Sequence, residues 1–336
     1  MLPCKRLTYN AIKMTNRTAE KLQTGIGGPM NLAVSDFARI LGAGLGELPP
    51  GCVEAIRSAD FRHHVLSGEE REKVLLRVIK ALDSGNLSVS GKQKRPQWEN
   101  GWAENLSEFT QTRDINRLIP KFVRRNEVVR LQGEYCQPVN PEFETAFVTV
   151  LRIFLFERYF RDVEQIFEFG CGTGLNLVAL ARMYPEKVLH GLDWAESSRR
   201  ILEELSPDFG NRLRGYVFDM FSPDSALDMP EDSALFTIGT MEQLGTDFEA
   251  FLQFALNKRP KVCIHVETVY ELYDQEHLFD YVAARYLERR NWLRGYLSRL
   301  RELESAGKLE LIKCQRTFGS LFHDGYSYIV WRPKNV

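Results

Sequence analysis

The sequence predicts an α/β fold with a doubly wound, mostly parallel sheet in its C-terminal half and a mainly helical extension before it. Two observations favour this class. From residue 163 onward, short apolar runs alternate with segments long enough to form helices, which is typical of βαβ units in a parallel sheet. The last two strand-like runs are close enough in sequence to pair as antiparallel neighbours. A chain of 336 residues, with 44% apolar and 26% charged side chains, can bury a core of this size.

The N-terminal extension has the apolar spacing of helices over residues 31–82. Ser67 and Glu70 have the spacing of a capping box, which marks the start of one of these helices. Residues 85–97 are rich in Gly, Ser, Lys and Gln, a composition that favours a linker. We therefore expect a helical extension that ends in a linker.

The next segment, 98–160, begins with Trp98 and Trp102 and continues with polar residues. A strand-like run at 127–135 and an amphipathic helix at 142–160 follow. This segment is expected to cover the ligand site of the domain that comes after it. The sequence thus predicts three parts, which are residues 1–97, 98–160 and 161–336.

The main domain contains five apolar runs that are predicted to be parallel strands. Right-handed crossovers between them place every carboxyl end on one edge of the sheet, where ligands of open α/β sheets bind. One long helix is expected at 275–306, followed by an antiparallel strand pair at 309–316 and 326–331. The five predicted parallel strands are 165–169, 188–193, 213–219, 234–240 and 261–268.

Composition and charge exclude several classes of protein. With 44 basic and 45 acidic side chains the net charge is -1, which disfavours a general nucleic-acid binder, so no DNA partner is expected. The longest apolar stretch, 146–156, is far shorter than the ~20 residues of a membrane span, and residues 1–20 lack the apolar core of a signal peptide. We expect a cytoplasmic protein with no membrane partner.

Six scattered cysteines without metal-type spacing predict reduced thiols and no metal site; they are Cys4, Cys52, Cys136, Cys171, Cys263 and Cys314.

The clearest functional pattern is the sequence Glu-Phe-Gly-Cys-Gly-Thr-Gly at 168–174, at the end of the first predicted strand. Glycines at such a turn let the backbone bend tightly and come close to a ligand. The dinucleotide fingerprint needs a glycine where Leu175 stands, so the pattern disfavours an NAD-dependent dehydrogenase.

Acidic residues end the next two strands. Asp193 can accept from both hydroxyls of a ribose, and Asp219 can accept from an adenine amino group, with Trp194 or Met220 against the ring.

This constellation resembles motif I and the strand ends of the class I S-adenosylmethionine (SAM)-dependent methyltransferases, over about residues 163–333. The resemblance implies a Rossmann-like fold whose sheet ends in an antiparallel pair, with SAM as the cofactor. It also implies that Glu168 senses the methionine amino group, Asp193 the ribose and Asp219 the adenine. The segment 239–244 resembles the part of the family that flanks the methyl donor. The expected cofactor-binding residues are Glu168, Gly170, Gly172, Gly174, Asp193, Trp194, Asp219, Met220 and Thr240.

Candidates for deprotonating the methyl acceptor lie at the remaining strand ends. His265 and Glu267 share one face of the fifth strand because side chains alternate along it. His323 lies in the loop 318–325, between the last two strands, with a glycine two residues after it. A histidine or carboxylate within reach of a hydroxyl assists by taking its proton. We expect one of these three catalytic candidates to be the base, with His323 favoured; a core role for His265 and a simple turn around His323 are the alternatives.

The acceptor is expected to be a small molecule, methylated at a hydroxyl of a sugar or secondary metabolite. N-methylation is the alternative, although no Asn-Pro-Pro-aromatic tetrapeptide of the kind used on base amino groups follows the fourth strand. A protein or RNA methyltransferase and a non-catalytic cofactor-binding subunit are further alternatives. Residues before 163 are expected to shape the acceptor site and not the cofactor site.

Arginines on the long helix form a solvated face or, alternatively, a cationic wall for a phosphate-bearing acceptor; they are Arg285, Arg289, Arg290, Arg294, Arg299 and Arg301.

Overall fold

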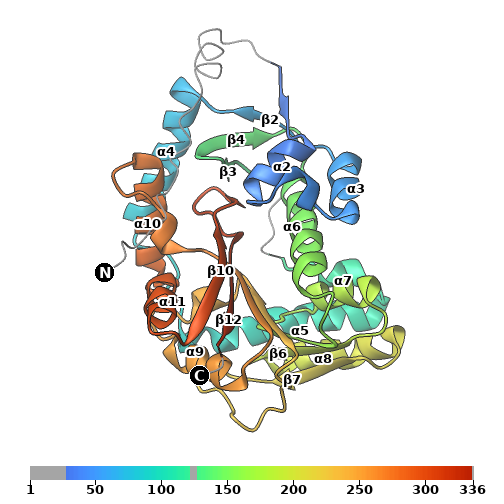
Figure 1. The fold of residues 1–336 in the computed structure, drawn as a ribbon. Helices are drawn as coiled ribbons and strands as arrows, with labels where there is room; N and C mark the ends of the chain where they lie inside the picture. Colours follow the sequence, from blue (N-terminus) through green and yellow to red (C-terminus); the bar gives the residue numbers. More distant parts are fainter. Residues whose placement is uncertain (1–27, 122–126, 335–336) are drawn as a thin grey trace.

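The computed structural model describes residues 28–121 and 127–334, which form two sheets (Figure 1). The larger sheet has seven strands in the order β10-β12-β9-β8-β5-β6-β7. The smaller sheet has five short strands and includes most of the strands of the N-terminal extension. Figure 1 shows α6 (Phe143–Tyr159) running from the small sheet at the top toward the large sheet below.

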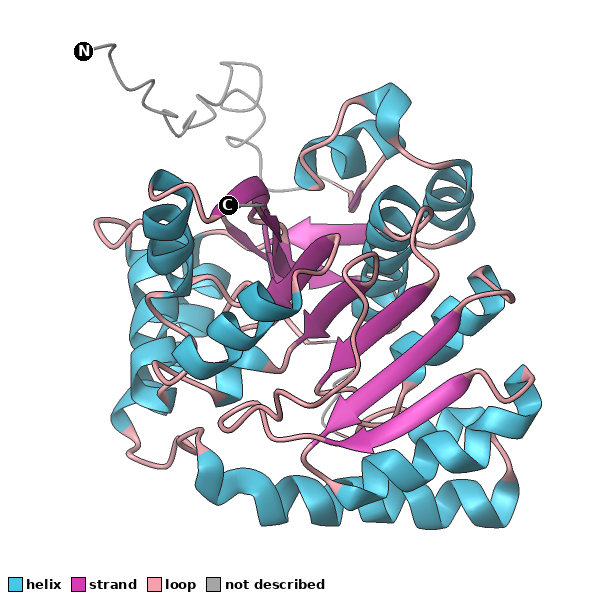
Figure 2. Cartoon of the chain, turned by 60° about the horizontal axis from the view of Figure 1, so that its bottom comes forward, coloured by secondary structure: helices cyan, strands magenta, loops and turns pink. Residues whose placement is uncertain are grey.

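The large sheet confirms the predicted fold class. Its first five strands pair in parallel, and the last two add as antiparallel neighbours, with β12 between β9 and β10. All seven predicted strands are present, each ending within two residues of its predicted end. Figure 2 shows the strands side by side, between groups of helices. They are β5 (Gln165–Phe169), β6 (Val188–Asp193), β7 (Leu213–Val217), β8 (Ala234–Ile238), β9 (Val262–Glu267), β10 (Leu309–Gln315) and β12 (Ser327–Pro333).

Helices cover both faces of the large sheet, as a doubly wound fold requires. Side chains alternate along β5, so that Ile166 packs into the core under α6, α7 and α8, while Phe167 and Phe169 pack into the core under α9 and α11. The inner strands β5, β6, β8 and β9 are buried almost throughout, which explains their largely apolar sequences, whereas the edge strands β7 and β10 are partly exposed. The helices are α7 (Leu175–Met183), α8 (Glu196–Leu205), α9 (Glu249–Lys258), α10 (Leu278–Arg290) and α11 (Tyr296–Ser305).

The prediction of one long helix at 275–306 was wrong. The chain makes α10 and α11 instead, separated by a short connection. Asn291 ends α10 in the left-handed region, with φ of 52°, and Gly295 precedes α11 with φ of 86°. Asparagine and glycine are the residues that adopt this conformation most readily, so the break has a local cause in the sequence.

The region before α6 contains the expected helices. The single strand-like run predicted at 127–135 falls on a hairpin of two strands, β3 and β4, whereas β1 and β2 were not predicted. The strands β1, β2, β4 and β3 pair in that order, and β11 joins them from the loop between the last two strands of the large sheet. Between β3 and β4, Gln132 and Gly133 have φ of 52° and 85°, the pattern of a tight two-residue hairpin turn. The elements are β1 (Met30–Asn31), α2 (Val34–Ile40), α3 (Pro50–Ser58), β2 (Arg62–Val65), α4 (Gly68–Asp83), α5 (Arg95–Thr112), β3 (Val129–Leu131), β4 (Glu134–Pro138) and β11 (Phe318–Gly319).

Two local predictions need correction. Helix α4 begins after Ser67 as expected, but the Ser67 side chain makes no capping hydrogen bond. Helix α5 starts at Arg95, inside the last residues of the predicted linker, replaces most of the predicted polar stretch and carries Trp98 and Trp102. Helix α5 packs along α8, beside the edge of the large sheet. Its weakly amphipathic sequence, with Pro96 in the first turn and a glycine inside, hid it from the periodicity analysis.

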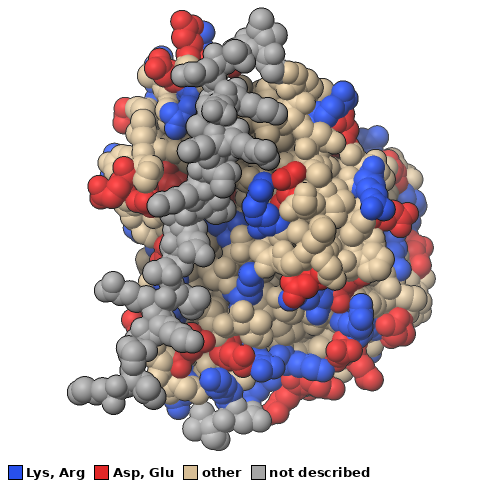
Figure 3. Space-filling view, turned by 45° about the horizontal axis from the view of Figure 1, so that its top comes forward, with Lys and Arg blue, Asp and Glu red and all other residues tan. Residues whose placement is uncertain are grey.

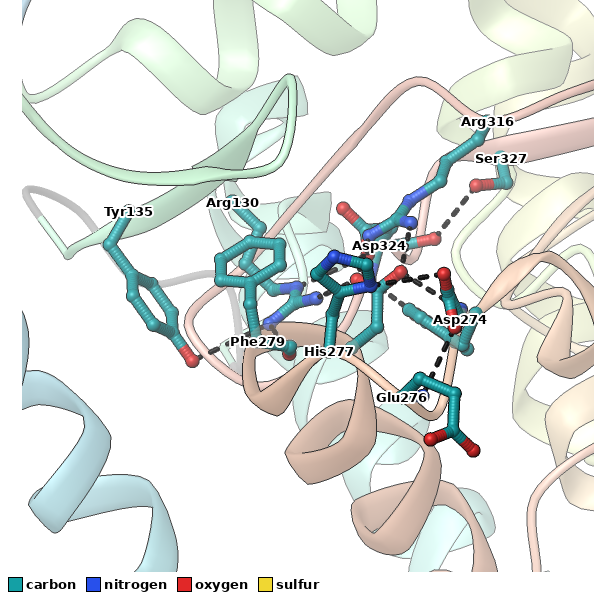
Figure 4. A network of polar contacts seen from close by, with 11 residues as sticks. Arg130, Tyr135, Asp274, Glu276, His277, Phe279, Arg316, Asp324 and Ser327 are labelled. Carbon is teal, nitrogen blue, oxygen red and sulfur yellow. Dashed lines mark hydrogen bonds and ion pairs between the residues drawn. The ribbon is translucent and has the colours of Figure 1, made fainter. Parts of the chain in front are cut away.

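A buried polar network joins the extension to the C-terminal part of the chain (Figure 4). Arg130 of β3 is fully buried and donates through Nε to Asp324 at 3.1 Å and through Nη2 to Asp280 at 3.2 Å. Arg316 donates to both Asp280 oxygens, at 2.7 and 2.6 Å, and to Asp324 at 2.9 Å. Two cations and two carboxylates balance one another here, so the network is a structural tie between distant segments.

The cysteines that the structure describes, Cys52, Cys136, Cys171, Cys263 and Cys314, are free thiols, and all but Cys314 are buried. Cys4 and the predicted absence of a signal peptide in residues 1–20 lie outside the described residues. Within the described ranges, no helix is long and apolar enough to cross a membrane. Nor do these ranges contain a group of three or more His, Cys, Asp or Glu residues arranged to hold a metal ion.

Candidate functional site

The glycine-rich loop after β5 turns in the way its sequence predicts. Gly170, Gly172 and Gly174 have φ of 72°, 51° and 76°, all in the left-handed region that favours glycine. The amides of Gly170 and Cys171 both donate to the Leu192 carbonyl at the end of β6, at 2.6 and 3.1 Å. A side chain at Gly170 would overlap Thr240 on the loop after β8. The glycine-rich loop is therefore held between the carboxyl end of β6 and the loop after β8, the two strands that flank β5.

Asp193 ends β6 and lies directly beside this loop. Its side chain is 6% exposed; Oδ2 accepts from the Gly172 amide and Oδ1 from the Ala195 amide, each at 2.9 Å. Each carboxylate oxygen can accept a second hydrogen bond, so Asp193 keeps acceptor capacity for a ligand. Burial raises the pKa of Asp193 to about 6, against the amide bonds that lower it.

Helix α5 covers this part of the site. A Cβ at Gly172 would lie 3.0 Å from the Trp102 ring, and Glu99 accepts from the amides of Glu196 and Ser197 at the start of α8. The Glu99 charge is close enough to Asp193 to raise its pKa further. Segment 98–160 therefore reaches the expected cofactor side of the sheet edge, and not the acceptor side alone.

The third strand end supplies an aromatic pair. Asp219 accepts from the Phe221 amide at 2.9 Å, and the Phe221 ring stacks on Trp194 with centroids 5.9 Å apart and planes 22° apart. Met220, the other expected ring contact, is buried in the core below. A flat heterocycle between the two rings needs a separation of about 7 Å, which is two contacts of about 3.5 Å. Trp194 and Phe221 can thus form an adenine site after a small opening.

Glu168 and Arg152 are joined through Asn176, and the sequence analysis identified only Glu168 of these three residues. Glu168 is 1% exposed; its Oε1 accepts from Asn176 Nδ2 at 2.7 Å, and its Oε2 is buried without a partner. Arg152 Nη1 donates to Asn176 Oδ1 at 3.2 Å, and its Nε is also buried without a partner. Burial raises the pKa of Glu168 to about 8 and lowers that of Arg152. Asn176 thus bridges Glu168 and Arg152, and each of these two side chains keeps an unsatisfied polar atom.

Sequence reasoning missed Arg152 and Asn176. Arg152 interrupts an otherwise apolar helix, and Asn176 is the second residue of the helix after the glycine loop. A charged residue inside an apolar helix next to a glycine-rich turn was the available signal, since such a charge is expensive to bury without a function.

The loop after β8 is fixed by Thr240 and Glu267. The Thr240 hydroxyl donates to the Gly170 carbonyl at 3.1 Å, and its amide donates to Glu267 Oε1 at 3.0 Å. Glu267 is 1% exposed, and its Oε2 is buried without a partner. Burial raises the pKa of Glu267 to about 7, although the bond from the Thr240 amide lowers it. Of the three base candidates, Glu267 is therefore the one that lies beside the glycine loop and Thr240.

The two histidine candidates are in less favourable surroundings. His265 is buried, with Nδ1 paired to Thr237 at 3.0 Å and Nε2 paired to Tyr296 at 2.9 Å, so both ring nitrogens are engaged. His323 packs against the Tyr286 and Trp292 rings, with a contact to Ser320 at 3.5 Å and an unpartnered Nδ1. Burial lowers the pKa of each to about 3, so both imidazoles are neutral near pH 7.

Three further residues at this edge were not among the expected site residues. Tyr326, just before β12, donates its hydroxyl to Glu144 Oε1 of α6 at 2.6 Å. Glu242 is half-buried in the short 3₁₀ helix Met241–Gln243 after β8. Burial raises its pKa to about 8, with a further rise from the Glu267 charge. Burial and the neighbouring Glu144 carboxylate raise the pKa of the Tyr326 hydroxyl well above its usual range.

The arginines of the predicted long helix do not form one cationic wall. They divide between α10 and α11, and several are committed to neighbours, as in the ion pairs of Arg285 with Glu288 and of Arg299 with Glu249. Arg290 donates to the Ser88 carbonyl and to the Tyr286 hydroxyl. On the face shown in Figure 3, basic and acidic side chains are interspersed.

No family model and no curated protein matches the sequence. Several solved structures are similar to the chain at low sequence identity. The cyclase SpnF is 13% identical, with 74% of this chain and 98% of that chain covered and a TM-score of 0.47. A geranyl diphosphate methyltransferase in complex with its substrate and sinefungin is 11% identical, over 73% and 98%, with a TM-score of 0.42. The magnesium protoporphyrin IX methyltransferase of Synechocystis PCC 6803 with bound SAM is 10% identical, over 56% and 77%, with a TM-score of 0.39.

Proposed function

We propose that this chain is a SAM-dependent methyltransferase that acts on a small-molecule acceptor. The observation that carries the proposal is the Arg152–Asn176–Glu168 arrangement beside the glycine loop. It offers one cation and one carboxylate, each with a buried unpartnered atom. An α-amino acid carries the complementary pair of charges, and its ammonium and carboxylate groups would satisfy both atoms.

The residues present fit the rest of the cofactor as well. Glu168 would bind the ammonium group of the methionine part and Arg152 its carboxylate. Asp193 would accept from the ribose hydroxyls, and Asp219 from the adenine amino group between Trp194 and its stacking partner Phe221. The glycine loop supports this reading because its left-handed backbone leaves no Cβ between the ligand and the ends of β5 and β6.

SAM, when bound, supplies a methyl group that its sulfonium already activates. The chain's own task is therefore to hold the acceptor in line, to exclude water and to take a proton from the acceptor. We propose that the proton goes to one of Glu267, His323 and His265. Glu267 is favoured, since its pKa near 7 suits a base at neutral pH and its Oε2 lacks a partner. Because a hydroxyl is a poor nucleophile until a base takes its proton, this assignment favours a hydroxyl acceptor, with an amine as the alternative.

Calorimetric titration with S-adenosylhomocysteine (SAH) and, separately, with NAD⁺ tests the proposal. We expect SAH to bind with one-to-one stoichiometry and NAD⁺ not to bind. Arg152→Met should weaken SAH binding by about 10- to 100-fold, the worth of a charge-assisted hydrogen bond. Arg158→Met, on an exposed turn of the same helix, is the matched control and should leave the affinity unchanged. Binding of NAD⁺ in place of SAH would refute the proposal.

A further inference from the structure

We propose that Trp292 and Arg294, on the connection between α10 and α11, bind a carboxylate group of the methyl acceptor, so that the acceptor is an organic acid. The inference rests on the proposed function and deepens it, because it names the chemical class of the acceptor. Neither residue takes part in the cofactor contacts or in the choice of base proposed above.

The connection between the two helices lies at the carboxyl edge of the large sheet. A Cβ at Gly245, on the loop after β8, would lie 2.7 Å from both the carbonyl oxygen and Nδ2 of Asn291. At the other end of the connection, a Cβ at Gly295 would lie 3.8 Å from the ring of Phe248, directly before α9. Both ends of the connection therefore rest on the segment that follows β8.

Trp292 is also held by the loop between β11 and β12. Its ring meets the His323 ring edge to face, with centroids 4.7 Å apart and planes 78° apart. This loop is fixed to the start of β12, since Ser327 Oγ donates to the Asp324 carbonyl at 3.1 Å (Figure 4). Ser327 in turn pairs with Glu267 at the carboxyl end of β9.

Trp292 therefore lies at the ends of β8, β9 and β12. In the sheet order these strands are on one side of β5. The strands β6 and β7, which lead to the proposed ribose and adenine contacts, are on the other side. The connection thus faces the part of the edge that the proposed cofactor contacts leave for an acceptor.

The connection carries two donors that lack acceptors. Trp292 is 5% exposed, and its Nε1 is buried without a partner. Arg294 Nε is likewise buried without a partner, and Arg294 forms no ion pair with another residue that the structure describes. Leu293 packs into the core with α9 and α11, whereas Trp292 packs against Tyr286 in a separate cluster. Alternation along this non-helical stretch therefore places Arg294 on the same side as Trp292.

A third polar group without a partner lies at the end of β9. Thr268 directly follows this strand, is fully buried, and its hydroxyl oxygen has no hydrogen-bond partner. Buried polar groups are normally paired, so unpaired donors gathered at one edge of the sheet indicate a ligand that accepts hydrogen bonds there.

The charge of the site favours a carboxylate over a phosphate. A carboxylate accepts through two oxygens and carries one negative charge, which the Arg294 guanidinium balances. A phosphate dianion needs more positive charge than this. Arg290, whose guanidinium lies 4.6 Å from the Trp292 ring centroid, is already committed to the Ser88 carbonyl and the Tyr286 hydroxyl, each at 2.8 Å.

Titration of the SAH-bound protein with benzoate tests the proposal, and the indole N–H signals of isotope-labelled protein provide the readout. The variant Trp292→Phe identifies the Trp292 signal by its loss. We expect benzoate to shift this signal and to leave the Trp331 signal unmoved, because Trp331 pairs with Cys263 near the opposite end of β9. Benzamide, the uncharged analogue of the same shape, should shift neither signal.

Variants of the arginine separate charge from shape. Arg294→Met should weaken benzoate binding by at least about tenfold, as for the loss of a charge-assisted hydrogen bond, and Arg294→Lys should recover part of the affinity. Arg289→Met removes the same charge from an exposed position near the end of α10. It is the matched control and should bind benzoate as the wild type does. The affinity for SAH should be the same in all three variants.

Each outcome bears on a different statement. If SAH binds but benzoate leaves the Trp292 signal unmoved, the carboxylate site is refuted while the proposed function stands. An equal shift with benzamide, or full benzoate affinity in Arg294→Met, refutes the site as well. If benzoate binds as expected but SAH does not bind, the proposed function fails, and with it the assignment of the carboxylate to a methyl acceptor.

Discussion

Replacing Glu168 with glutamine should stabilise the protein and weaken cofactor binding at the same time. Glu168 is buried with one unpartnered oxygen, and burial raises its pKa from the ordinary 4.5 to about 8. In the folded state without ligand it is therefore protonated at pH 7, whereas in the unfolded chain it is ionised. Glutamine has the same shape as the protonated acid and can still accept from Asn176.

The magnitude follows from the difference between the two states. Because the folded pKa is raised, the folded state binds more protons than the unfolded chain between pH 4.5 and 8, so stability from this group is lost as pH rises through that window. From pH 4.5 to pH 7, at about 1.4 kcal/mol for each pH unit, the loss amounts to about 3 kcal/mol. Glu168→Gln abolishes this loss, which for a chain of this length corresponds to a rise in Tm of roughly 4 °C at pH 7 and almost none at pH 4.5.

Thermal unfolding of the protein without ligand, followed by circular dichroism at pH 5 and pH 7.5, measures the effect. Glu54→Gln, an exposed carboxylate on α3, is the control and should leave Tm unchanged at both pH values. The same variants titrated with SAH should show a loss of about 10- to 100-fold for Glu168→Gln, which removes a charge-assisted contact to an ammonium group. A Glu168→Gln protein that is less stable than the wild type at pH 7.5, or that binds SAH with full affinity, would refute the reasoning.

Four other outcomes are expected. Asp193→Ala should cost about 2 kcal/mol or more of SAH affinity by calorimetry, because charge-assisted bonds to the ligand are lost; unchanged affinity would contradict the ribose assignment. Asp324→Asn should lower the free energy of unfolding in urea by about 3 kcal/mol, since Arg130 and Arg316 lose a buried counter-charge, while a loss below about 1 kcal/mol would argue against a structural tie. Trp102→Ala should weaken SAH binding, because the Trp102 ring covers Gly172. The loss of SAH affinity in this variant is to be compared with the loss in Trp98→Ala. Once an acceptor is known, alanine at the true base should lower turnover by about 10²–10⁴-fold with SAH affinity intact; the variants to compare are Glu267→Ala, His323→Ala and His265→Ala.

The large sheet was predictable because its signals are local and repeated. The inner strands β5, β6, β8 and β9 are apolar runs buried almost throughout. Segments of helix length separate the parallel strands, so strand ends were located within two residues. The glycine loop and the acidic residues Asp193 and Asp219 follow directly from those strand ends. Residues that act at the end of a strand are thus accessible to sequence reasoning, since topology brings them to one edge.

The rest of the site depends on contacts between segments distant in sequence. Arg152 lies in an apolar helix and Tyr326 in a turn, and only folding brings Arg152 to Asn176 and Tyr326 to Glu144. The small sheet was only partly predicted for the same reason: the run 127–135 falls on β3 and β4, but β11 comes from a loop almost 190 residues after β3. The sequence left a core role for His265 open, and only the folded structure shows that both of its ring nitrogens find partners inside the core.

A structure determined with SAH bound tests the central claim most directly. The account predicts the ligand's ammonium group within hydrogen-bond distance of Glu168 Oε2 and its carboxylate against Arg152. It also predicts the ribose hydroxyls on Asp193 and the adenine ring between Trp194 and Phe221, whose present spacing of 5.9 Å should increase to about 7 Å. SAH bound away from the carboxyl edge of the large sheet, or at that edge with Arg152 and Glu168 still lacking partners, would contradict the account.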